Sequence, residues 1–142
     1  MPTKRNVTRT KLFRMVHATW VEDYKFRPTI QDCREMFRNI NRQVFNNELK
    51  MPNFRLVYSK YYWGMCVGNF EEPGRCTIHI NKSFLCKRLF IDTMAHEMVH
   101  QWEWLNNENM THGPQFFLWK KELSNFGIHL GRAYRIKHYR LD

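Results

Sequence analysis

The chain has 142 residues, of which 43% are hydrophobic, and this is enough apolar material for one domain with a buried core. It has no apolar run of membrane-spanning length and no signal-peptide core, so we expect a soluble protein, cytoplasmic or nucleoid-associated (nuclear if eukaryotic) and not secreted. Lys and Arg outnumber Asp and Glu by 23 to 13, and the resulting net charge of +10 indicates a polyanionic partner such as nucleic acid.

Residues 1–27 are predicted to form a basic N-terminal extension, and residues 28–142 a single domain whose C-terminal segment is again basic. Leu12, Val16 and Trp20 share one helical face, which indicates that part of the extension is a helix docked on the body. Four cysteines are scattered without a Cys-x-x-Cys pair, so a zinc ribbon is not expected and the thiols are interpreted as ordinary interior side chains.

The first helix of the domain is predicted to begin after Pro28-Thr29. Thr29 is a suitable N-cap, and Asp32 falls near the N3 position in the first turn of the helix. The apolar residues that follow recur at helical spacing and are interpreted as core: Ile30, Cys33, Met36, Phe37, Ile40, Val44 and Phe45.

From residue 53 to residue 81 the pattern changes to short β-type runs, with candidate strands at 54–58, 65–70 and 75–80. The last two are separated by Glu71-Glu72-Pro73-Gly74, which is a turn sequence. We therefore expect a small three-stranded antiparallel sheet beside the helices, and an α+β fold with about three main helices. Such a sheet can offer an edge to which an extended polypeptide adds as a strand.

Lys60-Tyr61-Tyr62-Trp63 is a basic and aromatic cluster between two of these strands. Aromatic rings beside cationic groups can stack on unpaired bases, so the cluster is a candidate nucleic-acid contact. The alternative is that one or two of these rings cover the core. A second candidate contact lies near the C-terminus, where tyrosines alternate with basic residues: Arg132, Arg135, Lys137 and Arg140.

Residues 89–105 contain no Pro or Gly, and their apolar residues indicate a helix with one buried stripe. His96 and His100 lie four residues apart within it, on one face, where both can bind a single metal ion. Glu97 lies beside them and can act as general base on water. Asp92 and Glu103, one turn before His96 and one turn after His100, are candidate partners of the two ligands.

A third metal ligand is expected after the polar loop 106–111. His112 precedes Gly113-Pro114, and Pro is well placed in the first turn of a following helix, which we expect to run from Gly113 to about Phe126. The main competitor is Glu122 on that helix. His129 and Glu108 are weaker candidates. Three protein ligands would leave the fourth position of a zinc ion open to water and substrate. Phe116 or Phe117 is expected to pack beneath the site and fix His112.

The motifs His96-Glu97-Met98-Val99-His100 and His112-Gly113-Pro114-Gln115-Phe116 together resemble the SprT-like family, which includes Spartan-like DNA–protein crosslink proteases. Further similarity lies at 45–52, 63–68 and 76–81, and the resemblance covers roughly residues 30–130. It implies a zincin-like metalloprotease core, Zn²⁺ as cofactor, His96, His100 and His112 as ligands, and Glu97 as general base.

The resemblance and the charge together predict a zinc-dependent metalloprotease that acts on DNA-associated or DNA-crosslinked proteins and works as a monomer. We expect it to bind single-stranded or irregular DNA and no membrane. One alternative is a DNA-binding protein with a zinc site and little or no proteolytic activity. Another is a zinc peptidase whose basic charge selects acidic soluble substrates.

Overall fold

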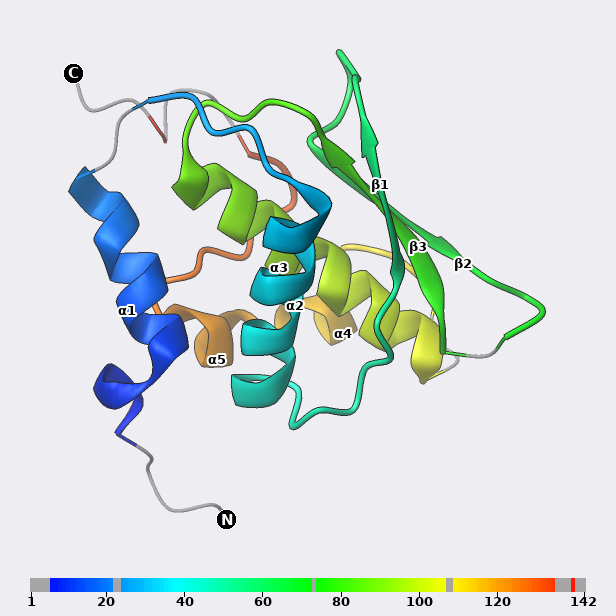
Figure 1. The fold of residues 1–142 in the computed structure, drawn as a ribbon. Helices are drawn as coiled ribbons and strands as arrows, with labels where there is room; N and C mark the ends of the chain where they lie inside the picture. The colour runs from blue at the N-terminus through cyan, green and yellow to red at the C-terminus, as the bar shows by residue number, and fades with distance from the viewer. Residues whose placement is uncertain (1–5, 22–23, 73, 107–108, 135–138, 140–142) are drawn as a thin grey trace.

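The computed structural model describes residues 6–21, 24–72, 74–106, 109–134 and 139 (Figure 1). Within them the chain forms an α+β fold, as predicted. A three-stranded sheet lies on one side, helix α1 (Lys11–Ala18) lies on the opposite side, and helices α2 (Ile30–Gln43) and α3 (Lys87–Leu105) lie between them. No helix in these ranges is long and apolar enough to cross a membrane.

The N-terminal part folds onto the body. A short 3₁₀ helix, η1 (Val7–Arg9), leads into α1, which Thr10 caps through a hydrogen bond from the Phe13 N–H to its hydroxyl. Leu12 and Val16 are fully buried, which confirms the predicted docking face for these two residues. Trp20 lies past α1, in the 3₁₀ helix η2 (Thr19–Val21), and is about half exposed at 49%.

Helix α2 begins as the sequence predicts. The Asp32 N–H donates to the Thr29 hydroxyl, and the Thr29 N–H donates to the Asp32 carboxylate, so the two residues form a reciprocal capping box. Most of the predicted apolar stripe packs into the core: Cys33, Met36, Phe37, Ile40, Val44 and Phe45 are buried, whereas Ile30 at the start of the helix is half-buried.

The sheet contains β1 (Asn53–Val57), β2 (Gly64–Gly68) and β3 (Cys76–Asn81) in the order β1-β3-β2. β2 and β3 pair in antiparallel fashion, as predicted, but β1 runs parallel to β3, so the expected all-antiparallel sheet is wrong for that pair. The reason is that the β2–β3 hairpin folds β3 against β1. β3 carries the fully buried Ile78 and Ile80 and takes the central place, which leaves β2 at an edge.

Helix α3 is the centre of the molecule. All residues from Leu89 to Gln101 are buried, so the expected helix with a single buried stripe is wrong: α3 is covered on every side, by the sheet, α2, α4 and the chain beyond α5. β2 lies very close to α3: a Cβ atom added to Gly64 would come within 2.8 Å of Thr93, and one added to Gly68 within 2.5 Å of the Trp104 ring. Only glycine allows this approach.

The predicted helix from Gly113 to Phe126 is interrupted. It consists of α4 (Pro114–Phe117) and α5 (Lys120–Ser124), and each piece buries one side chain fully in the core, Phe116 from α4 and Leu123 from α5. Pro114 opens α4 and Gly127, with φ of +84°, ends the second piece, as predicted at both ends.

Candidate metal centre

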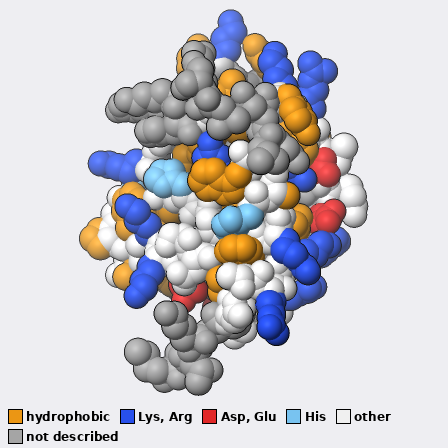
Figure 2. Space-filling model, turned by 90° about the vertical axis from the view of Figure 1, so that its left-hand side faces the viewer, with side chains coloured by type: hydrophobic (Ala, Val, Ile, Leu, Met, Phe, Trp, Pro, Cys, Tyr) orange, Lys and Arg blue, Asp and Glu red, His pale blue; other side chains and the backbone are white. Residues whose placement is uncertain are grey.

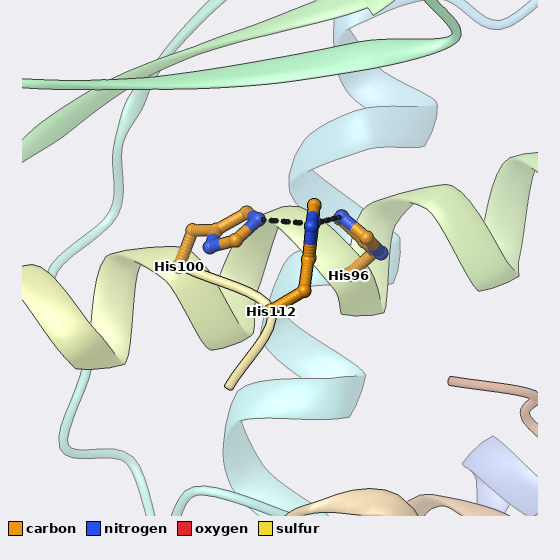
Figure 3. Close-up of side chains that lie close together, drawn as sticks. All are labelled: His96, His100 and His112. Carbon is orange, nitrogen blue, oxygen red and sulfur yellow. Dashed lines mark hydrogen bonds between the residues drawn. The ribbon is translucent and has the colours of Figure 1, made fainter. Parts of the chain in front are cut away.

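Three imidazole rings converge above the middle of α3 (Figure 3). His96 and His100 come from successive turns of α3, and His112 comes from the loop before α4. The His112 Nε2 lies 3.1 Å from the His96 Nε2 and 3.3 Å from the His100 Nε2. The structure therefore brings together the three histidines predicted to bind a metal, with one ligand atom of each within 4.8 Å of the others.

The spacing of these nitrogens suits a tetrahedral metal ion. Zn–N bonds of about 2.0–2.1 Å at the tetrahedral angle separate two ligand nitrogens by about 3.3 Å. The two Nε2–Nε2 separations from His112, 3.1 and 3.3 Å, are close to that value. Three neutral imidazoles are also a donor set that zinc accepts, so the residues present fit the ion. In the described part of the chain no fourth His, Cys, Asp or Glu joins this group.

The outer nitrogens of the two α3 histidines are held by acceptors, which fixes the tautomer of each ring. The His96 Nδ1–H donates to the Gly131 carbonyl at 2.9 Å, and the His100 Nδ1–H donates to the Glu103 carboxylate at 2.7 Å. Each Nε2 consequently presents its lone pair to the shared centre. Glu103 is thus a partner of a ligand, as expected, and it has no exposed surface.

The loop that carries His112 is tied to the same carboxylate. The Thr111 N–H donates to the second oxygen of Glu103 at 3.3 Å, so one buried side chain orients His100 and the residue before His112. Phe116 forms the floor, as predicted, because its ring centroid lies 4.9–5.0 Å from the centroids of all three imidazoles. Phe116 is fully buried, and its ring limits how far the imidazoles can tilt.

Asp92 has a different role from the one expected. Its carboxylate does not contact a histidine ring; it accepts hydrogen bonds from the His129 N–H and the Tyr139 hydroxyl. Burial raises its pKa to about 7, although both hydrogen bonds act in the opposite direction. Spacing on the helix placed Asp92 near His96 correctly, but the chain beyond α5 occupies the space between them.

The three imidazoles are neutral at neutral pH. Burial is the main cause for each: it lowers the pKa of His96 to about 3, with further lowering by the neighbouring His100 and His112, and that of His100 to about 4. The pKa of His112 is also lowered, first by burial and then by the charges of His100 and Arg132. Neutral imidazole is the form that binds a metal ion, so the site requires no deprotonation before binding.

Glu97 lies between α3 and the edge strand β2. The Cys66 N–H hydrogen-bonds to its carboxylate, and the Cβ of an added side chain at Gly64 would lie 3.2 Å from its Oε2. Burial raises the pKa of Glu97 to about 8. A divalent cation at the histidine centre would lower that pKa again by attraction to the carboxylate.

A cavity of about 780 Å³ opens over the histidines and Glu97. One wall is the connection into β2 and the first part of that strand, residues 59–66, and the other includes Met110 and residues 132–134. Because β2 is an edge strand, its backbone borders this cavity beside the candidate metal centre. The cavity combines an open strand edge, three metal-binding nitrogens and one buried carboxylate.

The residues predicted to contact nucleic acid are only partly brought together. Lys60, Tyr61, Tyr62, Trp63 and Arg132 all line the rim or walls of the cavity. Tyr61 is 93% exposed, whereas Trp63 stacks on Phe84 at 5.5 Å between ring centroids and so covers the core with one face. Arg135, Lys137 and Arg140 lie outside the described residues.

The competing ligands do not join the site. Glu122 lies exposed on α5 and His129 contributes its backbone N–H to Asp92, and neither belongs to the histidine group. Glu108 lies outside the described residues. Sequence reasoning missed Gly131 as a partner of His96, and no signal could have found it, because the contact uses a backbone carbonyl.

Comparison with known proteins agrees with this geometry. A protein-family model described as the SprT-like family matches residues 33–138, which is most of the chain and includes all three histidines and Glu97. A search of curated proteins found no match. The match begins four residues after the cap of α2 and ends before Tyr139. The chain belongs to the SprT-like family.

Proposed function

We propose that this protein is a zinc-dependent metallopeptidase with a zincin-like core that cleaves proteins associated with or crosslinked to DNA. The observation that carries the proposal is the convergence of the His96, His100 and His112 Nε2 atoms at zinc-compatible spacing, beside the buried carboxylate of Glu97. Family membership supports a metalloprotease-like domain. The metal, the reaction and the substrate class are the proposal.

The roles of the residues follow from their positions. His96, His100 and His112 would hold the ion, which supplies Lewis-acid chemistry by acidifying water and polarising a carbonyl. The Glu97 carboxylate accepts the proton of the attacking water and then donates it to the leaving amine. The Cys66 N–H fixes one side of that carboxylate, so Glu97 can transfer a proton without a rearrangement of its side chain.

An extended polypeptide is the substrate shape that the cavity favours. Residues 64–66 of the edge strand β2 border it, and an added strand can pair with the backbone of this edge outside the Cys66 N–H, which Glu97 occupies. Gly64 and Gly68 have no Cβ and so allow β2 to pack directly against α3. A strand paired at this edge would therefore pass over the histidine centre. An unfolded or locally opened protein segment meets this requirement better than a compact domain.

Charge supports DNA as the partner. The chain carries a net charge of +10, and on the face shown in Figure 2 Lys and Arg side chains outnumber acidic ones and are spread along its margins. Lys60 and Arg132 stand at the cavity itself, next to the highly exposed Tyr61. Phosphates bound by these cations would hold a DNA-linked protein near the cleavage centre, and Tyr61 can stack on an unpaired base.

The test is cleavage of a protein crosslinked to single-stranded DNA by zinc-loaded wild type and by Glu97→Gln. We expect wild type to cleave the crosslinked protein faster than the same protein without DNA, and the variant to bind zinc and DNA but cleave at least about 10²-fold more slowly. Zinc and DNA binding without cleavage by wild type would favour a DNA-binding protein with a zinc site. Equal cleavage with and without DNA would favour a peptidase for soluble substrates.

A further inference from the structure

Residues 128–134 pass beside α3 on the side of His96 that faces away from the metal centre. The Gly131 carbonyl accepts the His96 Nδ1–H at 2.9 Å, and the Tyr134 hydroxyl lies 3.3 Å from the same nitrogen. The Tyr134 hydroxyl also lies 3.3 Å from the Asp92 carbonyl and 3.2 Å from the His129 carbonyl, and its one proton can be donated to either, so Tyr134 links α3 to this part of the chain. The orientation of the His96 ring therefore depends on where residues 128–134 lie.

The Asp92 carboxylate holds those residues in place. Asp92 lies on α3 one turn before His96 and is only 1% exposed. One oxygen accepts the His129 N–H at 3.1 Å, and the other accepts the Tyr139 hydroxyl at 2.6 Å. We call residues 128–134 together with Tyr139 the C-terminal brace. Ile128 and Leu130 bury their side chains in the core and give the brace its apolar contact.

A second contact connects the brace to the N-terminal extension. Arg88 lies one turn before Asp92 on α3, and its guanidinium lies 4.7 Å from the ring centroid of Tyr139 and 4.8 Å from that of Trp20. Cation–π contacts of this kind favour the stacked arrangement of the two rings on the guanidinium. Trp20 and Tyr139 both lie outside the family match at residues 33–138, whereas Arg88 lies within it, so only the two rings of this contact come from beyond the match.

We infer that Tyr139 is a positioning residue for the metal centre: by its hydrogen bond to Asp92 it holds the rest of the C-terminal brace, residues 128–134, against His96, and Trp20 supports Tyr139 through Arg88. The chain of contacts runs from Trp20 to Arg88, Tyr139, Asp92 and the brace, and ends at the ring of a ligand. The inference rests on the proposed function in that it assumes that His96 binds a metal ion.

Loss of the Tyr139 hydroxyl leaves one Asp92 oxygen, deep in the protein, without that donor. The brace then loses one of its two bonds to Asp92, and the Gly131 carbonyl is less firmly placed against His96. Removal of a direct partner of a metal ligand typically weakens metal binding by about 10–100-fold, so removal of the Tyr139 hydroxyl, which acts through Asp92 and the brace, is expected to weaken it by about tenfold. Trp20 acts only through Arg88, so its replacement by alanine is expected to weaken zinc binding less, by about threefold.

The experiment measures zinc affinity by competition with a fluorescent chelator for wild type, Tyr139→Phe and Trp20→Ala. The control is Tyr24→Phe, which removes a hydroxyl from an exposed tyrosine of the same extension. We expect about tenfold weaker zinc binding for Tyr139→Phe, a smaller loss in the same direction for Trp20→Ala, and no change for the control. The visible spectrum of bound Co²⁺, which reports ligand geometry, should change for Tyr139→Phe.

The outcomes separate this inference from the proposed function. If wild type does not bind zinc or Co²⁺, the proposed function fails. If wild type binds zinc and Tyr139→Phe binds it with equal affinity and an unchanged Co²⁺ spectrum, the positioning role fails and the proposed function stands. A lower melting temperature of the metal-free variant, with unchanged affinity and spectrum, also overturns the inference, because it shows a structural role alone.

Discussion

Substitution of Gly64 by alanine should displace Glu97 while leaving the three histidines intact. An added Cβ would lie 2.8 Å from the Thr93 Cγ2, 3.1 Å from the Glu97 Cγ and 3.2 Å from the Glu97 Oε2. All three atoms belong to buried side chains of α3, so the space open to them is the adjoining cavity. The contact is relieved only if β2 moves away from α3 or the Thr93 and Glu97 side chains shift.

The magnitude follows from the overlap. Carbon atoms pack at about 3.5 Å or more, so the strand or the side chains must shift by about 0.7 Å. Overpacking of this kind costs about 1–3 kcal/mol of unfolding free energy. A displacement of a catalytic group by nearly 1 Å lowers the rate by about 10- to 100-fold. We therefore expect Gly64→Ala to remain folded, bind zinc normally and lose at least about tenfold in kcat.

The assay is steady-state cleavage of the crosslinked protein, with zinc content and urea denaturation measured on the same samples. Gly68→Ala is the matched control, because Gly68 lies on the same strand as Gly64 but away from Glu97. Its added Cβ would come within 2.5 Å of the Trp104 ring on α3. We expect the control to lose stability and retain its kcat. Wild-type kcat for Gly64→Ala, or an equal loss of kcat in both variants, would refute the reasoning.

Three further predictions concern the ligands and their environment. Glu103→Gln should weaken zinc binding by about tenfold, since His100 loses a charged acceptor; unchanged affinity in chelator competition would contradict its role. His112→Ala should lose zinc under conditions in which Glu122→Ala keeps one equivalent, and the reverse result would move the third ligand to α5. Burial raises the pKa of Glu97 from 4.5 to about 8, so the folded metal-free protein keeps a proton on Glu97 that the unfolded chain releases. The unfolding free energy of the wild-type protein should therefore fall as the pH rises from about 4.5 to about 8. Glu97→Gln should therefore gain stability relative to wild type between about pH 5 and pH 8 in urea titrations, and a pH-independent difference would contradict the raised pKa.

The centre itself was predictable because its information is local. The spacing of His96 and His100 fixes their common face once the segment is a helix, and Gly113-Pro114 indicates a helix start immediately after His112. Glu103 could be expected for the same reason, since it lies one turn beyond His100. Each of these inferences needs only the geometry of one helix or of one loop.

The rest depended on contacts between segments far apart in the chain. The place of β3 between β1 and β2 follows from how deeply Ile78 and Ile80 pack, and alternation within a strand does not reveal which neighbour it pairs with. Complete burial of α3 likewise depends on what covers it. The support of His96 by Gly131 joins residues 35 positions apart through a backbone carbonyl, which has no signature in a sequence.

The central claim is that His96, His100 and His112 bind one zinc ion and leave a position open for chemistry. X-ray absorption at the zinc edge, on wild-type protein loaded with one equivalent of zinc, tests it most directly. The account predicts three imidazole nitrogens at about 2.0–2.1 Å and one oxygen ligand that added azide or another small anion displaces. A fourth ligand from a protein side chain that no small anion displaces, or retention of the same spectrum in His112→Ala, would contradict it.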